Sequence, residues 1–578
     1  MKLKQTAHYI LLILLFNCSS HNQVELFTKE NKADHIATGT EYVISTQGKY
    51  ASEAGKKILE QGGNLMDAAI AVSFTLSVER PQSTGIGGGG FLLYHQKDAG
   101  VKAFDFRETA PGKILVNDFI DPVTKKPDPK KSQEGALAVA TPGMVAGMWH
   151  LHQKYGKLPW RIILAPAIEL ADEGFPVYPE LVIAFDRAKN VLEQFPKTKE
   201  LYFRKNGEML KEGDLFQQKK LAYTLRRIAK EGANTFYIGD VANQIAAAVQ
   251  EYKGKLSIED LRQYSVKERT PLKGSFLGKD IYAMPLPSSG GIHLLQILNA
   301  LENRNFKKED FFKTDTIHYT ASMFQQAFAD RKNYLGDSDF VKVPVDKLID
   351  KNLAEQWLKN FDPSKAKIPD MVKPSNLDAD KVKEKESKET THFSIMDKEG
   401  NIIVSTQTIN GPFGSGLIAG DTGIMLNNEM DDFSFQVGDL NYFGAIGGEK
   451  NLVQPRKRPL SSMVPTIIFE NGKPVMGLGS PDGTRIITCV ATTLFNRYKY
   501  GMSLQDAIWT KRYHQQLNPD ELWIEEGSFS ASTIKELEKL GHHVTRKKPW
   551  CKVQAVEKNG DELIGVADPR GRGMVIAK

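Results

Sequence analysis

The stretch Lys388-Glu389-Thr390-Thr391-His392-Phe393-Ser394 marks an abrupt change in the character of the chain. Upstream of it, residues 381–389 hold four Lys, three Glu and one apolar residue. Such a run buries too little apolar surface to order itself, so we expect it to be solvated and mobile. Downstream, residues 392–396 and 401–408 are rich in Phe, Ile, Val and Thr, which is typical of strands. Residues 397–400 between them predict a hairpin loop.

The register of this hairpin places two hydroxyl groups together. If the loop centres near residue 399, Thr390 faces Thr408, and facing Cα atoms of antiparallel strands lie about 4.5–5.5 Å apart. A Thr that ends a charged segment suggests a nucleophile released by chain cleavage between Glu389 and Thr390, with the freed α-amine as its base. An α-amine has a pKa of about 7.7–8.0, so this chemistry needs no His. From the residues alone, an ordinary hairpin after a surface linker is the alternative.

Three other stretches accompany the Thr390 segment, namely 287–291 (PSSGG), 427–433 (NNEMDDF) and 457–463 (KRPLSSM). Together they resemble, in order, the signatures of the γ-glutamyltransferases (γ-glutamyltranspeptidases), which are N-terminal-nucleophile hydrolases, and specifically the bacterial type with a lid. The resemblance covers roughly residues 40–578. It implies a four-layer αββα sandwich with two largely antiparallel sheets between helices. The pattern of apolar residues by itself supports only a mixed α/β fold.

The resemblance also implies a self-cleaving enzyme. Cleavage would divide the chain into a large subunit, 41–389, and a small catalytic subunit, 390–578, which stay together as a heterodimer. Thr390 would take the γ-glutamyl group from glutathione or a similar donor. Water, an amino acid or a dipeptide would then remove that group. The resemblance implies no cofactor and no metal.

Two groups of residues are expected to hold the amino-acid end of the donor. Arg107 follows two strand-like runs, 91–95 and 101–106, and a surface Arg at a strand exit is the alternative. By resemblance, Arg107 clamps the α-carboxylate with Ser461 and Ser462, and a planar guanidinium suits that role. By resemblance, the α-ammonium is bound by a second set of residues, namely Asn410, Glu429 and Asp432. Without the resemblance, a solvated loop is the alternative for residues 427–433.

Asp482-Gly483 matches the position of the family's oxyanion-hole loop, where two Gly residues are usual. Backbone N–H groups make such a hole, so Asp482 can still donate. Its carboxylate must point away from the developing oxyanion, and a positive φ would strain it. Between Asp432 and Leu452 the chain has the Gly and aromatic content of a lid. By resemblance, Phe443 aligns with the family's lid tyrosine, and Tyr442 lies beside it.

The first residues predict export. Lys2 and Lys4 precede an apolar run at 9–16, which is too short to span a membrane as a mature helix. Cys18 at its end resembles a lipoprotein cleavage site, so we expect a signal peptide over 1–18 and a tether over 19–40. The expected location is periplasmic or at the cell surface, with a lipid anchor on Cys18 as the only membrane attachment.

Composition and the remaining motifs exclude several other classes. A net charge of +6 over 578 residues, without Lys/Arg clusters interleaved with aromatics, gives no support for nucleic-acid binding. The Gly-rich run 85–90 precedes a strand-like segment instead of opening a helix, which favours a close-packed turn over a phosphate site. The three Cys give neither a disulfide framework nor metal-ligand spacing, and Cys489 is expected to be a buried small apolar side chain.

Two rival functions remain at this point. One is an acylase or a γ-polyglutamate-processing enzyme with the same nucleophile and a different acyl pocket, against which Arg107, Ser461, Ser462 and the lid argue. The other is a non-catalytic surface lipoprotein that retains the fold, against which an intact Thr390 and Thr408 argue.

Overall fold

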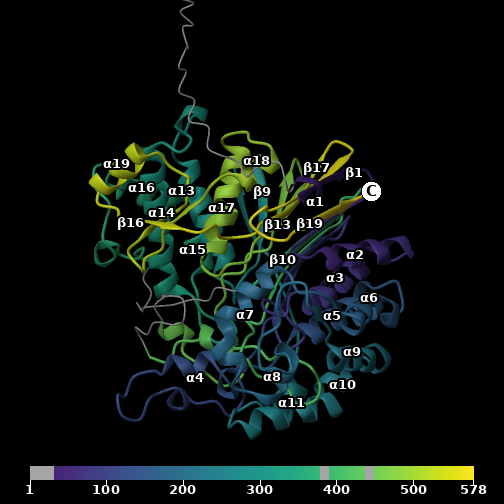
Figure 1. Cartoon of the computed structure of the whole chain (residues 1–578). Coiled ribbons are helices and arrows are strands. Elements are labelled where there is room, and N and C mark those ends of the chain that lie inside the picture. Colours follow the sequence, from purple (N-terminus) through teal and green to yellow (C-terminus); the bar gives the residue numbers. More distant parts are fainter. Residues whose placement is uncertain (1–31, 378–389, 437–447) are drawn as a thin grey trace, which may run out of the picture.

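The computed structural model describes residues 32–377, 390–436 and 448–578, which form two seven-stranded antiparallel sheets (Figure 1). Sheet I contains, in spatial order, β1 (Ile36–Gly39), β18 (Glu562–Ala567), β17 (Gln554–Asn559), β13 (Lys473–Gly479), β12 (Thr466–Glu470), β9 (Lys279–Ala283) and β8 (Leu272–Phe276). Sheet II contains β19 (Met574–Ala577), β2 (Tyr42–Thr46), β10 (Thr391–Asp397), β11 (Ile402–Thr408), β3 (Gly89–Gln96), β4 (Gly100–Phe106) and β7 (Lys267–Arg269).

Helices cover the outer face of each sheet. On sheet II lie α2 (Lys49–Glu60), α3 (Leu65–Glu79), α5 (Met144–Tyr155) and α6 (Trp160–Glu173), followed outward by α7 (Pro179–Leu192), α8 (Pro196–Tyr202), α9 (Lys219–Glu231), α10 (Asn234–Tyr237), α11 (Asp240–Glu251) and α12 (Ile258–Gln263). The helices on the side of sheet I are α13 (Gly290–Glu302), α14 (Thr314–Tyr334), α15 (Val345–Leu348), α16 (Lys351–Lys359), α17 (Arg485–Tyr498), α18 (Leu504–Trp509) and α19 (Ala531–Lys539). The four-layer αββα expectation is therefore confirmed.

The shorter elements complete the chain. They are α1 (Lys32–His35), α4 (Pro129–Gln133), the two-stranded sheet of β5 (Phe175–Pro176) and β6 (Leu215–Phe216), and the three-stranded sheet of β14 (Tyr513–His514), β15 (Leu522–Glu525) and β16 (Val544–Lys547). Within the described residues no helix is both long enough and apolar enough to cross a membrane.

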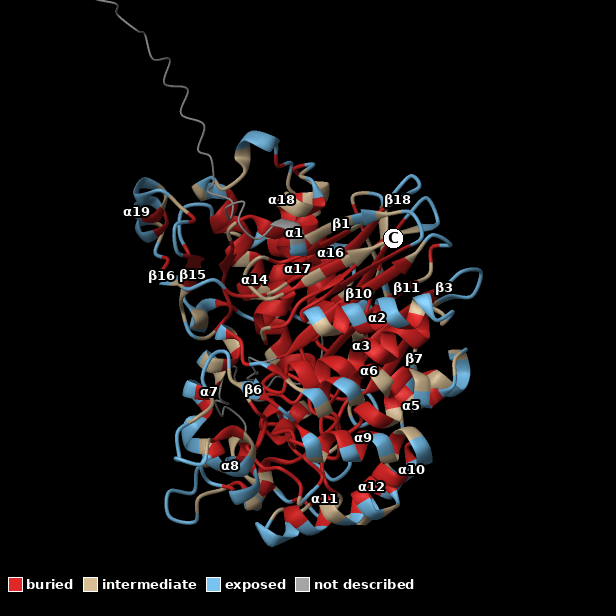
Figure 2. Ribbon diagram, turned by 45° about the vertical axis from the view of Figure 1, so that its right-hand side comes forward, coloured by how far each residue is buried: buried red, intermediate tan, exposed pale blue. Residues whose placement is uncertain are grey.

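Alternation along β10 and β11 explains why the two sheets stack. Phe393, Ile395 and Ile403 pack on the helices over sheet II, whereas Met396 and Val404 face sheet I. Successive side chains of a strand point to opposite faces, so a strand that is apolar on both faces must be covered on both. Figure 2 agrees with this arrangement: buried residues run continuously through both sheets.

The predicted hairpin register is confirmed. Thr391 pairs with Gln407 and Met396 pairs with Ile402, so the pairs are centred on residue 399. The Gly-rich run is also confirmed as a close-packed turn into a strand. A Cβ atom on Gly88 would lie 2.1 Å from the carbonyl oxygen of Thr408, so only glycine lets the backbone come this close to the end of β11.

Two expectations about the ends of the fold and its cysteines need correction. Residues 36–39, expected within a tether over 19–40, form β1 and pair with β18, so the chain joins the fold before residue 40. Cys489 is buried, as expected, but it is not an isolated apolar side chain, because it forms a disulfide with Cys551, 62 residues away. The spacing of the three Cys in the sequence could not predict this disulfide, because the contact forms only when the loop before β17 folds back onto α17. The expected signal peptide and Cys18 lie outside the described residues.

Candidate active site

Thr390 immediately precedes β10, in the centre of sheet II, and is buried. Continuing the ladder by one pair places it opposite Thr408, and both residues line one small cavity together with Gly483. The Thr408 hydroxyl oxygen accepts the backbone N–H of Asn410 at 2.8 Å, where the chain turns with a positive φ of 73°. Thr408 therefore fixes the loop that carries Asn410. Glu389, the other side of the predicted cleavage site, lies outside the described residues.

Arg107, at the end of β4, is fully buried in a group of carboxylates. Its guanidinium forms ion pairs with Glu429 and Asp432, which belong to one short 3-10 turn, Glu429–Asp432. A third buried carboxylate, on Glu108, lies 3.8 Å from Arg107 Nη1. The Arg107 guanidinium thus lies close to three buried acidic side chains at once.

Burial determines how these carboxylates titrate. Desolvation raises the pKa of Glu429 well above its usual range, and it also raises the pKa of Asp432, although the Arg107 charge opposes both shifts. Desolvation likewise raises the pKa of Glu108 to about 7. Burial alone would lower the pKa of Arg107, but the neighbouring carboxylates reverse this and raise it. The guanidinium therefore stays charged, and a second cation would relieve the crowded carboxylates.

Five buried side-chain oxygens in this region have no hydrogen-bond partner among the described residues, namely Glu108 Oε1 and Oε2, Asn410 Oδ1, Glu429 Oε2 and Asp432 Oδ1. Buried polar atoms are rarely left unpaired, because each one costs about 1–3 kcal/mol. An ammonium group has three N–H donors, which can pair with three of these acceptors. The set can therefore bind an ammonium.

Ser461 and Ser462 line the same small cavity as Arg107. A neighbouring loop holds them in place. The Ser461 N–H donates to the Pro287 carbonyl at 2.8 Å, and the Ser289 hydroxyl donates to the Ser461 carbonyl at 2.9 Å. This explains why the PSSGG stretch at 287–291 accompanies the serines: it fixes their backbone beside the cavity.

The carboxylate of Asp482 is bound by the Cys551 N–H and by Arg485. The φ of Asp482 is 108°, the strained conformation considered above, and Gly483 follows with φ 60°. Its Oδ2 accepts the N–H of Cys551 at 2.9 Å, and its other oxygen is ion-paired with Arg485. Burial opposes ionisation, but Arg485 and the Cys551 N–H outweigh it and hold the pKa of Asp482 below its usual value. The negative charge is thus neutralised locally, which makes Asp482 compatible with an oxyanion loop.

Two cavities meet at Thr390. The small one, about 10 Å³, is lined by all the predicted donor-binding residues except Asn410. The other, which we call the outer cavity, has a volume of about 390 Å³ and contains Thr390 and Asp482. In the described residues no group of three His, Cys, Asp or Glu is placed to hold a metal ion. The lid residues Tyr442 and Phe443 lie outside the described residues.

Sequence reasoning missed Glu108, Arg485 and the Cys551 contact. Glu108 follows Arg107 directly in the sequence, and this adjacency was the one available signal for it. Arg485 lies three residues after Asp482, a spacing at which opposite charges commonly meet. Nothing local in the sequence pairs Cys551 with this loop.

Two facing antiparallel sheets between helices, with a threonine at the start of a central strand, define the class of the N-terminal-nucleophile hydrolases. The model of the gamma-glutamyltranspeptidase family matches residues 51–578. A glutathione hydrolase proenzyme of Escherichia coli (strain K12) is 42% identical over 94% of this chain and 92% of its own length. Another, from Pseudomonas aeruginosa, is 37% identical over 92% of this chain and 93% of its own length. The chain therefore belongs to the γ-glutamyltranspeptidase family.

Solved structures agree with this assignment. A cephalosporin acylase from Bacillus halodurans has a TM-score of 0.82, with 25% identity over 96% of this chain and 99% of its own. A Helicobacter pylori γ-glutamyltranspeptidase chain has a TM-score of 0.55, with 41% identity over 57% of this chain and 93% of its own. The acylase shares the arrangement of layers, whereas the family assignment rests on the higher identities.

Proposed function

We propose that the chain is the precursor of a γ-glutamyltransferase and glutathione hydrolase, with Thr390 as its nucleophile. The observation that carries the proposal is a set of unpartnered buried acceptors, with Glu429 and Asp432 lining the cavity that contains Thr390, and Asn410 on the loop that follows Thr408. Such a set fits the free α-ammonium of a γ-glutamyl group. Relatives named glutathione hydrolase proenzymes, at 42% and 37% identity, support the same assignment.

Maturation is proposed to occur at the Glu389–Thr390 bond. The Thr390 hydroxyl oxygen attacks the Glu389 carbonyl carbon, the peptide C–N bond breaks, and the nitrogen gains a proton to become the free α-amine. The resulting ester is hydrolysed by water, which leaves a carboxylate on Glu389 and restores the Thr390 hydroxyl. The products are the large subunit ending at 389 and the small subunit 390–578.

In the transfer reaction the α-amine of Thr390 accepts the hydroxyl proton while the oxygen attacks the γ-carbonyl carbon of the donor. The backbone N–H groups of Asp482 and Gly483 would stabilise the oxyanion. The amide C–N bond then breaks, the proton passes to the leaving amine, and a γ-glutamyl ester of Thr390 remains. Water or an amine attacks this ester and regenerates the enzyme. No step requires a cofactor or a metal.

The donor's α-carboxylate is assigned to Arg107, Ser461 and Ser462. Arg107 uses three N–H groups on the Pro459 carbonyl, Glu429 and Asp432, so two of its five remain for a carboxylate. With these ion pairs closed, the small cavity has room for about one water molecule. The side chains must therefore move apart to admit a glutamyl end, and the incoming ammonium replaces part of the positive charge that Arg107 supplies to the carboxylates.

Export, the lipid anchor on Cys18 and the lid residues Tyr442 and Phe443 are part of the same proposal. They are supported by the N-terminal sequence pattern and by the composition of residues 435–444. A mature enzyme anchored at Cys18 would be released into a soluble fraction by Cys18→Ala, and an ordinary free N-terminus on the wild type would exclude the anchor.

The direct test is turnover of γ-glutamyl-4-nitroanilide by purified protein, with and without a dipeptide acceptor. We expect release of nitroaniline in both conditions, faster with the acceptor if transfer competes with hydrolysis. Thr390→Ser is a matched variant that keeps a hydroxyl, and Thr390→Ala removes it. Activity that survives in Thr390→Ala would rule out the proposed nucleophile.

The structural likeness to a cephalosporin acylase makes an acylase the second candidate. An acylase needs no free α-ammonium on its donor, so comparing a free donor with an N-acetylated one separates the two functions. Equal use of both donors would favour the acylase.

A further inference from the structure

We propose that the outer cavity is a carboxylate subsite, in which Arg187 and Lys548 select amine leaving groups and acceptors that carry a carboxylate. The inference deepens the proposed function and rests on it. It concerns the part of the substrate beyond the scissile amide, whereas the residues around Arg107 concern the glutamyl end.

Thr390 determines which part of a substrate lies in the outer cavity. Thr390 lines both cavities, and the residues assigned to the glutamyl end line only the small one. With the acyl group on that side, the amine that leaves, and the acceptor that replaces it, must lie on the side of the outer cavity. The dipeptide released from glutathione carries one free carboxylate there.

The lining of the outer cavity is strongly basic. Six Lys and Arg residues line it but only two carboxylates, those of Glu180 and Asp482. Both carboxylates are already neutralised. Glu180 lies 3.6 Å from Arg80 Nη1 and 3.9 Å from Lys552 Nζ, and Asp482 is paired with Arg485. The lining therefore attracts anions and offers little to a cation.

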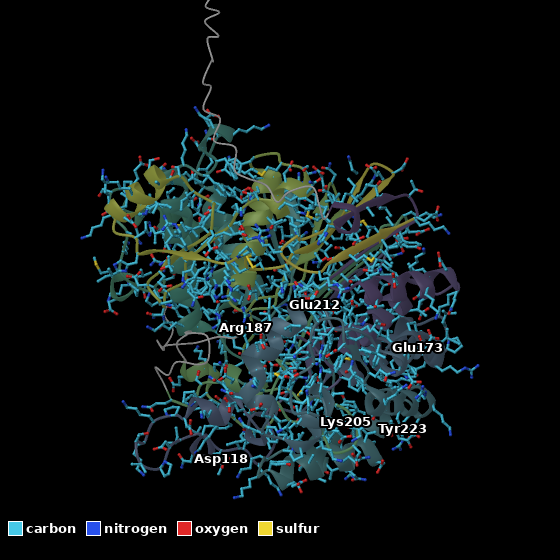
Figure 3. All side chains as sticks on the ribbon, viewed as in Figure 1. Asp118, Glu173, Arg187, Lys205, Glu212 and Tyr223 are labelled. Carbon is cyan, nitrogen blue, oxygen red and sulfur yellow. A yellow bond between two sulfur atoms is a disulfide. The ribbon has the colours of Figure 1, made fainter. Side chains whose placement is uncertain are left out.

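Arg187 and Lys548 are the cations of this lining that remain available. Neither forms an ion pair or a hydrogen bond with another described residue, and both are exposed. Arg187 lies on α7, where the helices over sheet II meet the C-terminal part of the chain (Figure 3). Lys548 lies in the loop between β16 and β17. The two residues come from different segments and line the same cavity, so each can attract a carboxylate bound there.

Deeper in the lining, three buried donor groups have no hydrogen-bond partner among the described residues, namely Ser83 Oγ, Arg485 Nε and Trp550 Nε1. Each belongs to a residue that is more than nine-tenths buried. Unpaired donors of this kind are costly unless a ligand satisfies them. Carboxylate oxygens accept hydrogen bonds and carry the charge that the basic lining favours, so a carboxylate suits both observations.

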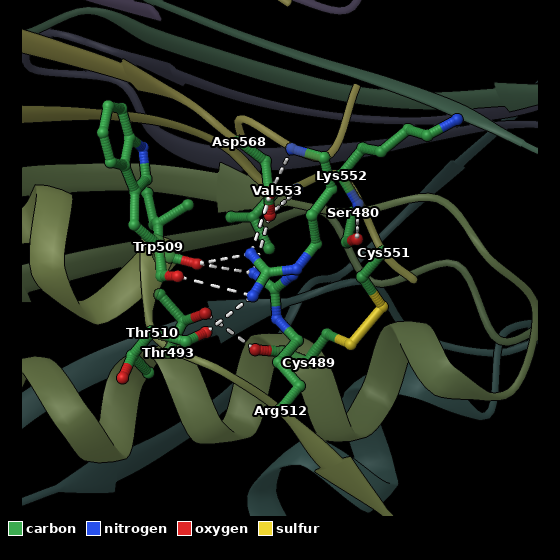
Figure 4. A network of polar contacts seen from close by, with 12 residues as sticks. Ser480, Cys489, Thr493, Trp509, Thr510, Arg512, Cys551, Lys552, Val553 and Asp568 are labelled. Atoms are coloured by element: carbon green, nitrogen blue, oxygen red, sulfur yellow. Dashed lines mark hydrogen bonds and ion pairs between the residues drawn. A yellow bond between two sulfur atoms is a disulfide. The ribbon is translucent and has the colours of Figure 1, made fainter. Parts of the chain in front are cut away.

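A wall of the outer cavity is held rigidly, which suits a binding site. Cys551 and Lys552 line it, and Cys551 is tied by its disulfide to α17 (Figure 4). Beside them, Arg512 binds Asp568, whose Oδ2 also accepts the N–H of Val553 at 3.1 Å. The segment that precedes β17 is thus fixed from both sides.

The test compares two chromogenic donors that differ by one carboxylate, γ-glutamyl-4-nitroanilide and γ-glutamyl-3-carboxy-4-nitroanilide. The measured quantity is the ratio of their kcat/KM values, carboxylated over plain. In the double variant Arg187→Gln/Lys548→Gln we expect this ratio to fall about tenfold, because each exposed cation contributes a modest electrostatic attraction. Raising the salt concentration from about 0.05 to 0.5 M should lower the wild-type ratio in the same direction.

Two matched controls separate this subsite from a general charge effect. Lys189→Gln/Arg546→Gln removes two exposed cations from α7 and from β16, neither of which lines the outer cavity. This control should keep the wild-type ratio. Arg187→Lys/Lys548→Arg keeps both charges and should restore most of it. An unchanged ratio in the Gln double variant, or an equal fall in the Lys189/Arg546 control, would overturn the proposal.

Failure of the proposed function gives a different result. If the wild type releases nitroaniline from neither donor, the γ-glutamyl assignment fails, and the subsite is tested by binding alone. Calorimetric titration with 5-amino-2-nitrobenzoate, the amine of the carboxylated donor, should then show tighter binding to the wild type than to the Gln double variant. Equal binding to the two proteins would overturn the subsite as well.

Discussion

The two cavities that meet at Thr390 differ in what holds them together. Around Arg107, one cation is shared by three buried carboxylates, and the cavity is almost closed. The outer cavity has a volume of about 390 Å³, is basic, and has two cations at its rim that are available to a ligand. The difference agrees with the two proposed roles. The closed side would bind the glutamyl group that all donors share, and the open side would receive amines of varied shape.

The disulfide links these two regions, and its removal should have the largest effect on stability. Cys551 lines the outer cavity, its N–H binds Asp482, and Gly483 lines the small cavity. Closing a loop across 62 residues contributes roughly 4 kcal/mol in the chain-entropy description. We expect Cys489→Ser/Cys551→Ser to lower the free energy of unfolding by about that amount, measured by urea denaturation. Wild type incubated with a thiol reductant is the matched control, and an unchanged midpoint in both would contradict the assigned role.

Asp432→Ala tests the closed side. A buried charge-assisted contact is worth about 1.5–3 kcal/mol, so its loss should lower kcat/KM roughly 10- to 150-fold for a free γ-glutamyl donor. We expect the variant still to cleave itself, because cleavage needs Thr390 and its neighbours but no glutamyl end. Acetylating the donor's α-amine should lower the kcat/KM of the wild type by a much larger factor than it lowers the kcat/KM of the Asp432→Ala variant. A variant that loses as much activity on the acetylated donor as on the free one would show that Asp432 does not bind the ammonium.

Glu108 makes the closed side sensitive to pH. Its folded pKa, about 7, lies above the unfolded value of 4.5, so between these values the folded state binds more protons than the unfolded state. Wild-type stability should therefore fall as pH rises from about 4.5 to 7, by roughly 1–3 kcal/mol. Glu108→Gln should reduce this fall, measured as the difference between urea midpoints at pH 5 and pH 8. Identical pH dependence in the variant and the wild type would exclude Glu108 as its source.

Local patterns were enough to predict the framework of the site. The register of β10 and β11 follows from a short loop and from strands that are apolar on both faces, and the structure confirms it pair by pair. The Gly-rich run was recognisable because it leads into a strand. The resemblance to a family then supplied the layers and brought distant motifs together. The described structure places Arg107, Ser461 and Ser462 around one cavity with Thr390 and Thr408.

Contacts between distant segments could not be predicted in the same way. Arg107 meets Glu429 and Asp432 across 322 and 325 residues, and no spacing in the sequence shows that the guanidinium lies between the two carboxylates. The Cys489–Cys551 disulfide and the outer cavity also bring together segments that are far apart in the sequence. The cavity is assembled from α7, the loop before β17 and the residues after α3. Charge and burial at such places become visible only when the chain is folded.

The central claim is that Thr390 becomes the first residue of a separate chain. The direct measurement is N-terminal sequencing and denaturing electrophoresis of active, purified protein. We expect two bands of roughly 41 and 21 kDa, from residues 18–389, which keep Cys18, and 390–578 of a 64.5 kDa chain, and the smaller should begin Thr-Thr-His-Phe. Thr390→Ala should give one uncut band and no activity. Wild-type protein that is active as a single uncut chain, or a small fragment that begins at another residue, would contradict the account.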